Sequence, residues 1–210
     1  MFAMSIRFVM VVCLSAWAAA AAQAAESGGA EAAYAQGDFE AARALSLPLA
    51  EAGDAGAQYR VAVLHHRGQG GAADSETAAG WYRKAADQGH AAAQTELGWM
   101  YLHGDGVRPD GGAAFMWLLR AEKQHSVPAV YYIAEMHRTG RAAPHDSGYA
   151  VQLYRKAAAK GHVAATYRLG FMYELGFGVL GDRDQAIAWY TRAAEAGSAD
   201  AAAALGRMQN

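Results

Sequence analysis

Apolar and small side chains recur along this chain every 36 residues, with no insertion or deletion between the copies. Positions that are one period apart are called a column here. One column holds large apolar side chains, Trp81, Trp117, Leu153 and Trp189, and another holds Val61, Leu97, Ile133, Leu169 and Leu205. A repeat of this length predicts a stacked array, because one small unit cannot bury its apolar face without neighbours.

Within one period the pattern predicts two helices. Ala78, Trp81, Tyr82, Ala85 and Ala86 fall at i, i+3, i+4, i+7 and i+8, which gives one broad apolar stripe on an outer helix. An aspartate column precedes this helix, and its carboxylates can accept the unpaired amide hydrogens of the first turn: Asp74, Asp110, Asp146 and Asp182. A glycine column follows it and can take the left-handed conformation: Gly89, Gly161 and Gly197.

The second, inner helix of each unit carries the aliphatic column and ends at a Gly-rich turn. We therefore expect inner helices near 55–67, 91–103, 127–139 and 163–175, and outer helices near 74–88, 110–124, 146–160 and 182–196. A first hairpin is expected from 30–36 and 39–52, with Pro48 kinking its second helix because proline removes a backbone hydrogen bond. A final helix is expected at 199–208.

These residues resemble a known repeat. The run Leu97-Gly98-x-x-Tyr101-x-x-Gly104-x-Gly106-Val107-x-x-Asp110, followed by Ala114-x-x-Trp117, is similar to the Sel1-like repeat, a relative of the tetratricopeptide repeat, and the copy from Leu169 to Ala194 is at least as close. Residues 34–53 match more loosely, in a tetratricopeptide-like form. The resemblance implies an all-α fold, a right-handed α-α superhelix (solenoid) that usually serves as an adaptor for other proteins.

The expected domain organisation follows from the repeat. Residues 25–210 form a single solenoid, with units at about 26–53, 55–89, 91–125, 127–161 and 163–197 and a terminal helix at 199–208. The unit from 127 to 161 departs from the pattern, because His125 and Ala142 replace glycines and Pro144 enters its loop. We expect the turns of this unit to differ in shape. The terminal helix is a lone half-unit that a partner or a second copy could cover.

Residues 1–24 have the pattern of a cleavable signal peptide. Arg7 precedes a short apolar run, and small residues ending in Ala22-Gln23-Ala24 form a cleavage site. The apolar run is shorter than the ~20 residues of a spanning helix, which argues against an uncleaved anchor. Val12 before Cys13 argues against lipidation, and cleavage would remove the only cysteine. We expect a periplasmic protein, with secretion as the alternative and no membrane span after cleavage.

Composition narrows the function further. The net charge of -2 disfavours a nucleic-acid partner, which usually requires a basic face. The sequence has no His-Glu-x-x-His motif, no Gly-x-Ser-x-Gly elbow and no phosphate loop, so we expect no catalysis, no cofactor and no metal. A zinc site from His66 and His103 is a weighed alternative. His90 and His162 share a column at the start of an inner helix, which indicates a structural role.

The candidate site is a groove on the inner helices that binds another protein or peptide. Similarity to tetratricopeptide geometry, carried along the chain in steps of 36, predicts its lining: Tyr59, Val63, His66, Thr95, Trp99, Leu102, Tyr131, Glu135, Arg138, Tyr167, Phe171 and Glu174. Rigid aromatic side chains suit protein-binding surfaces because they offer much contact area at small entropic cost. The competing interpretation is that these aromatics only pack against neighbouring helices, as the column Met100, Met136 and Met172 is expected to do.

The sequence thus favours an exported, non-enzymatic scaffold or regulator that holds a peptide or protein segment in this groove. One alternative is a structural component of an envelope assembly, such as a secretion, polysaccharide or motor complex, held by its outer helices and its open C-terminal helix. Another, an envelope hydrolase, would need a pocket with converging polar groups, which the sequence does not display. The partner and the oligomeric state are left open.

Overall fold

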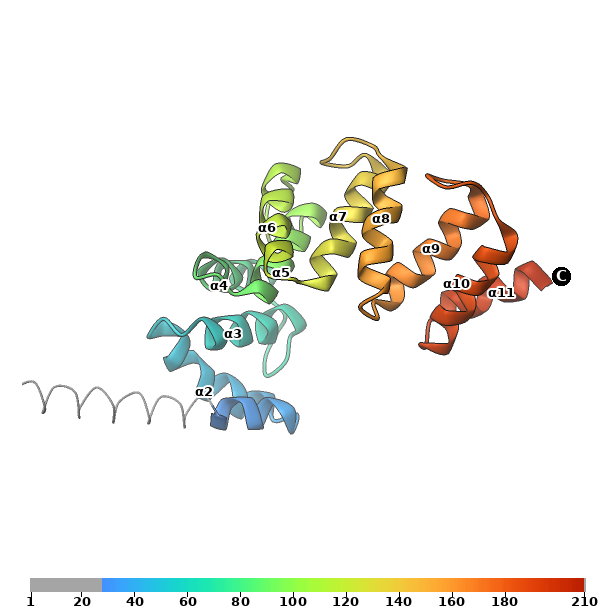
Figure 1. Ribbon diagram of the computed structural model, residues 1–210. Helices are drawn as coiled ribbons and strands as arrows, with labels where there is room; N and C mark the ends of the chain where they lie inside the picture. Colours follow the sequence, from blue (N-terminus) through green and yellow to red (C-terminus); the bar gives the residue numbers. More distant parts are fainter. Residues whose placement is uncertain (1–27, 210) are drawn as a thin grey trace, which may run out of the picture. The chain divides into compact units, whose positions relative to one another are not determined.

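The computed structural model describes residues 28–209, and within them the regular structure is entirely helical. The signal-peptide prediction for residues 1–24 falls outside this range. Residues 28–35 form the first helical segment. The helices that follow are α2 (Phe39–Glu51), α3 (Ala55–Arg67), α4 (Ser75–Asp87), α5 (Ala91–His103), α6 (Gly111–Lys123), α7 (Val127–Thr139), α8 (Ser147–Ala158), α9 (Val163–Leu175), α10 (Arg183–Glu195) and α11 (Ala199–Gln209) (Figure 1).

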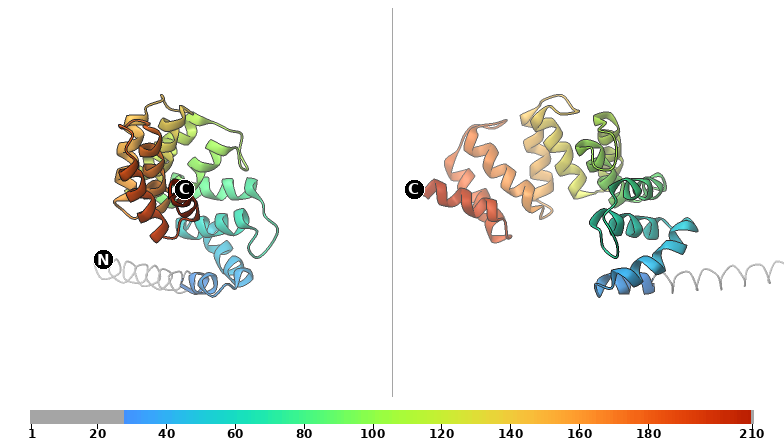
Figure 2. Two further views of the ribbon diagram at one scale, coloured as in Figure 1. Left: turned by 90° about the vertical axis from the view of Figure 1, so that its right-hand side faces the viewer. Right: turned by 180° about the vertical axis from the view of Figure 1, so that it is seen from behind.

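The helix boundaries confirm the all-α prediction. The inner helices α3, α5, α7 and α9 begin and end at the predicted residues, and the outer helices α4, α6, α8 and α10 are one or two residues shorter at their ends. Helix α2 runs through Pro48 without a break in its assignment. Within each of its compact units, consecutive helices pack against one another, for example α7 against α8 and α8 against α9, as the repeat requires (Figures 1 and 2).

Two compact units divide the chain between His90 and Ala91, at a repeat boundary. Unit 1 comprises residues 28–90 with α2 to α4, and unit 2 comprises residues 91–209 with α5 to α11. Each unit has its own buried core. The prediction that 25–210 forms one solenoid stays a prediction.

The aspartate column caps the outer helices, as predicted. The Oδ1 atoms of Asp74, Asp110, Asp146 and Asp182 accept the backbone N–H three residues on, at distances of 2.9, 3.0, 2.8 and 3.0 Å. Gly89, Gly161 and Gly197 adopt φ angles of 90°, 82° and 92° after the same helices, which confirms the left-handed turns. Side-chain caps and left-handed residues therefore mark where the outer helices begin and end.

The expectation that the third unit has differently shaped turns is wrong at two positions. His125 and Ala142 have φ angles of 65° and 66°, which fall in the left-handed region that the corresponding glycines occupy, such as Gly178 at 70°. The side chains therefore change while the backbone conformation is kept. This costs free energy, because a Cβ atom in the left-handed region approaches the neighbouring carbonyl oxygen.

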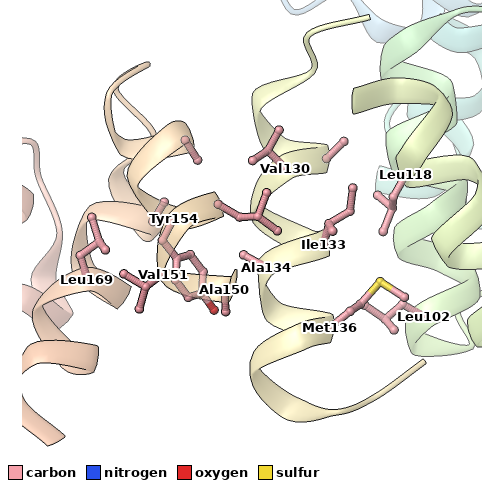
Figure 3. Packing of buried hydrophobic residues seen from close by; sticks show 14 of the residues in the cluster. Leu102, Leu118, Val130, Ile133, Ala134, Met136, Ala150, Val151, Tyr154 and Leu169 are labelled. Atoms are coloured by element: carbon pink, nitrogen blue, oxygen red, sulfur yellow. The ribbon is translucent and has the colours of Figure 1, made fainter. Parts of the chain in front are cut away.

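Helix α7 lies at the centre of the core of unit 2. Figure 3 shows Ile133 and Met136 facing Leu102 and Leu118, while Ala134 on the other side of α7 faces Tyr154 of α8. Met100, Met136 and Met172 are all buried, which confirms the packing role expected for that column. In unit 1 the aliphatic residues of α2 and α3 form the equivalent core.

Candidate functional site

A recess of about 440 Å³ opens on α3 in unit 1, where the sequence places the groove. Tyr59, Arg60 and Val63 of α3 line it, together with Tyr34 from the first helical segment and His90. The Tyr59 ring stacks on His90, with 4.6 Å between ring centroids. Of the predicted groove residues in this unit, Tyr59 and Val63 line the recess, and His66 instead meets the Tyr82 ring edge-on at 5.9 Å.

A recess of about 560 Å³ occurs in unit 2, and two of the predicted groove residues, Tyr131 and Tyr167, line it. Arg168 and Ala164 of α9 and Ser198, Ala199 and Asp200 at the start of α11 complete much of its wall. Four residues of this wall lie three periods of 36 residues after residues that line the recess in unit 1. They are Ala164, Tyr167, Arg168 and Ser198, which follow Gly56, Tyr59, Arg60 and His90 in that order. Each unit therefore carries a recess at the same place in the repeat, with a tyrosine and an arginine in its wall.

Beside the recess of unit 2, Glu135 is the centre of a polar cluster. Its carboxylate accepts hydrogen bonds from Arg138 Nη2 at 2.7 Å, from Arg168 Nε at 2.8 Å and from the Tyr154 hydroxyl. The side chain of Glu135 is 17% exposed, so these donors replace most of the water around it. Two predicted groove residues, Glu135 and Arg138, are thus brought together, and Arg168 joins them to the recess.

The electrostatics of this cluster favour a charged carboxylate. Burial raises the pKa of Glu135, but the hydrogen bonds from Arg138 and Tyr154 and the charge of Arg168 outweigh it, so the pKa lies below its ordinary value. The pKa of Tyr154 is raised by burial and by the adjacent Glu135 charge. The cluster is therefore fixed in one charge state near neutral pH and presents two arginines around one carboxylate.

Buried tyrosines of the outer helices reach polar groups on the inner helices in two columns. The Tyr190 hydroxyl donates to Glu174 at 2.5 Å, as Tyr154 donates to Glu135. One repeat has Leu118 in place of this tyrosine. The inner helix of that repeat has Trp99 in the column of Glu135 and Leu102 in the column of Glu174. The two hydroxyl–carboxylate pairs thus occur in the repeats that have both a tyrosine and a glutamate, whereas Tyr82 meets the ring of His66 edge-on.

The remaining predicted residues differ in their exposure. Thr95 and Leu102 are 5% and 6% exposed, and the Thr95 hydroxyl hydrogen-bonds Ser126 Oγ at 2.9 Å. Both offer little surface to a partner and are better described as packing residues. Trp99 is half-buried and stacks on His103 at 4.5 Å, and Phe171 meets the Phe177 ring at 6.3 Å. The aromatic part of the predicted lining in unit 2 therefore consists of Trp99, Tyr131, Tyr167 and Phe171.

Sequence reasoning missed Arg60 and Arg168, because their column, Arg60, Glu96, Tyr132 and Arg168, has no constant character. The structural role expected for the histidine column holds for His162, whereas His90 lines the recess of unit 1. His162 is the N-cap of α9, and its Nδ1 accepts the Ala165 N–H at 3.2 Å. Burial lowers the pKa of His162, which keeps this nitrogen free to accept the hydrogen bond.

The described part of the chain shows no grouping of three or more His, Cys, Asp or Glu side chains that could hold a metal ion. None of its helices is long and apolar enough to cross a membrane. The groups that the structure does place on the inner-helix face are aromatic rings, guanidinium donors and the Glu135 carboxylate.

Comparison with known proteins agrees with this geometry. The Sel1 repeat matches residues 55–90, 91–126, 127–162 and 163–198. A Sel1 repeat protein from Oxalobacter formigenes is 32% identical, with a TM-score of 0.78 over 85% of this chain and 73% of that one. A protective antigen of uropathogenic Escherichia coli with an SLR fold is 30% identical, with a TM-score of 0.72 over 88% of this chain and 42% of that one.

A third structure, a putative Sel1 repeat protein from Klebsiella pneumoniae, is 21% identical, with a TM-score of 0.61 over 90% and 93% of the two chains, and supports the fold alone. No functionally curated protein matches the chain. The four matched repeats cover more than half of the sequence, and the helix ends and turns of the structure follow their period. The chain belongs to the Sel1 repeat family.

Proposed function

We propose that this protein is an exported, non-enzymatic scaffold that binds a peptide or protein segment on its inner-helix face. The observation that carries the proposal is the recurrence of a recess in both units at one place in the repeat, lined by Tyr59 with Arg60 and by Tyr167 with Arg168. Sel1 repeats generally serve as protein-interaction scaffolds, which supports the same conclusion.

The residues around the recess of unit 2 suit a segment of low net charge. Arg138 and Arg168 are already bonded to Glu135, so the face offers no strong excess of one sign at this place. The half-buried rings of Tyr131 and Tyr167 supply contact area that is fixed before binding, which keeps the entropic cost low. Binding would therefore depend mainly on apolar contacts, with the guanidinium groups orienting backbone carbonyls of the partner.

A double substitution in unit 2 tests this proposal. Immobilised Trp99→Ala/Tyr167→Ala protein should lose capture of the partner that the wild type retains, while the helical circular dichroism is unchanged. Tyr149→Ala is the matched control, because Tyr149 is an exposed aromatic residue on outer helix α8. Capture that survives the double substitution, or that is lost equally in the control, would contradict the inner-helix face as the binding surface.

An envelope-assembly component is the second candidate, and one exposed loop favours it. Leu175, Phe177 and Leu180 are exposed around the turn between α9 and α10, with Leu180 91% exposed. The three earlier repeats have mostly polar or small residues in the same columns. These are Arg67, Gln69 and Ala72 in the first, His103, Asp105 and Arg108 in the second, and Thr139, Arg141 and Pro144 in the third. If this loop carries the contact, Phe177→Ser/Leu180→Ser rather than the Trp99/Tyr167 variant should abolish assembly in a co-sedimentation assay.

A further inference from the structure

A separate pocket of about 400 Å³ lies in unit 2 between the start of α7 and the end of α8. Val127, Val130 and Ala157 form its apolar part, and His125, Lys156 and Lys160 form its polar part. Val130 and Ala157 are buried, whereas the three polar residues are exposed. None of these residues belongs to the predicted groove or to the recesses on the inner-helix face.

The equivalent place in two earlier repeats is occupied by a hydrogen-bonded pair of glutamines. Gln88 Nε2 donates to Gln58 Oε1 at 2.8 Å, and Gln124 Nε2 donates to Gln94 Oε1 at 2.9 Å. Gln88 and Gln124 lie in the column of Lys160, and Gln58 and Gln94 lie in the column of Val130. Because valine has no polar atom and lysine is not an amide, the bridge cannot form in this repeat. Two of the residues that line the pocket, Val130 and Lys160, are therefore the ones that replace the glutamine pair of the two earlier repeats.

The third departure in this repeat brings an imidazole to the pocket. His125 stands where the other repeats have Gly89, Gly161 and Gly197, and it keeps their left-handed backbone with φ of 65°. A non-glycine residue in this conformation costs about 1 kcal/mol or more and marks a place where a side chain can have a function. The His125 side chain, which is kept despite this cost, lines the pocket.

The charges around the pocket leave one cation available. Lys156 forms an ion pair with Glu122. Within residues 28–209 the Lys160 ammonium has no acidic partner, and it lies over an apolar floor of valine and alanine side chains. A ligand that matches this arrangement has a small apolar group to fill the floor and one negative charge to meet Lys160.

We propose that this pocket binds a small apolar carboxylate, with Lys160 and His125 at the carboxylate and Val127, Val130 and Ala157 around the apolar group. The carboxylate can be that of a free short-chain acid or that of the C-terminal residue of a peptide. The pocket volume admits one side chain of the size of leucine with its carboxylate, and not a folded partner.

Chemical-shift titration of the isotopically labelled full chain tests the proposal. The probes are hexanoate, N-acetylleucine and N-acetylleucinamide, which has the same side chain without the charge. We expect saturable shifts for at least one acid, with a dissociation constant on the order of a millimolar, and at least about tenfold weaker binding of the amide. Tighter binding of N-acetylleucine than of hexanoate identifies a peptide C-terminus as the source, and the reverse order identifies a free acid.

The variant Val130→Gln/Lys160→Gln introduces the glutamine pair of the two earlier repeats and should abolish acid binding without loss of thermal stability. Lys123→Gln removes one positive charge from exposed α6 outside the pocket and should leave binding unchanged. The proposal is overturned if neither acid binds, if the amide binds as well as the acids, or if the glutamine variant still binds. The groove variant Trp99→Ala/Tyr167→Ala should retain acid binding, which separates this pocket from the proposed scaffold function.

Discussion

The contact between Gly111 and Ala142 predicts a coupled pair of stability effects. Ala142 has a φ angle of 66°, and a Cβ atom added at Gly111 would lie 2.3 Å from the Ala142 Cβ atom. Carbon atoms pack best at about 3.5–4.0 Å, so the two Cβ atoms exclude each other. In the next repeat the corresponding loop residue is Gly178, which faces Ser147. In both repeats a glycine faces a residue with a side chain, but the glycine stands at the start of the helix in one (Gly111) and in the loop in the other (Gly178).

The single substitutions should have opposite signs. Ala142→Gly relieves a left-handed alanine and should stabilise the protein by about 1 kcal/mol. Gly111→Ala forces two Cβ atoms together and should destabilise it by about 1–3 kcal/mol, as overpacking does. In the Ala142→Gly background this clash is gone, and the nearest remaining contact, to the Cα atom of residue 142 at 3.2 Å, needs only a small shift. The double variant should therefore be at least as stable as the wild type.

Thermal and urea denaturation followed by circular dichroism measure these differences. For a chain of this size, 1 kcal/mol corresponds to a change of about 2–4 °C in Tm. The coupling free energy from the double-mutant cycle should be at least about 1 kcal/mol. Gly178→Ala with Ser147→Gly is the control, because the added Cβ would meet the Ser147 carbonyl oxygen at 2.2 Å, and removing the serine side chain cannot relieve it. Additive effects at 111 and 142, or a lower Tm for Ala142→Gly, would refute the reasoning.

Three further predictions follow from the caps, the polar cluster and the N-terminus. Burial lowers the pKa of His162 in the folded state, so the stabilisation by neutral His162 is present above the unfolded pKa of 6.5 and is lost as pH falls below that value. The variant His162→Ser keeps an N-cap, and its Tm should fall less between pH 7.5 and 5 than the Tm of the wild type. An equal fall in Tm would contradict this role of His162. Tyr154→Phe removes a donor from the Glu135 carboxylate and should destabilise by about 1–2 kcal/mol in urea denaturation, whereas no change would show that the two arginines suffice. Cell fractionation should recover the protein in the periplasmic extract with an N-terminus near Ala25 by intact mass, and an unprocessed protein confined to the cytoplasmic fraction would contradict the export proposal.

Helix boundaries could be predicted from the sequence because local contacts determine them. An aspartate side chain meets the N–H three residues on, and a glycine follows the last turn, so the signal and the structure lie within a few residues of each other. His125 and Ala142 show the limit of this reasoning. Their side chains suggested a new turn shape, but the packing of the flanking helices holds the backbone in the shape that the repeat imposes.

The candidate site was predictable only in part, because burial depends on residues far away in the sequence. Tyr131 and Tyr167 line a recess as expected, but Thr95 in the same column is covered through its hydrogen bond to Ser126, 31 residues later. Arg168 was missed because no residue type recurs in its column. A repeat pattern predicts which positions face one side of a helix, but not which of them a neighbouring helix covers.

The recurring residues of the Sel1 signature therefore explain why the chain folds, and under the proposed scaffold function the columns that vary carry what it recognises. The aspartates cap helices, the glycines turn the chain, and the alanine and aliphatic columns fill the core, so each of these recurring residues has a structural role. The column of Val63, Trp99, Glu135 and Phe171 has four different side chains on one backbone position. In the same way, Val130 and Lys160 line a pocket at the two columns where two earlier repeats carry a hydrogen-bonded glutamine pair. Because the backbone is nearly constant from repeat to repeat, each such change alters the surface without altering the fold, and binding specificity can evolve one column at a time.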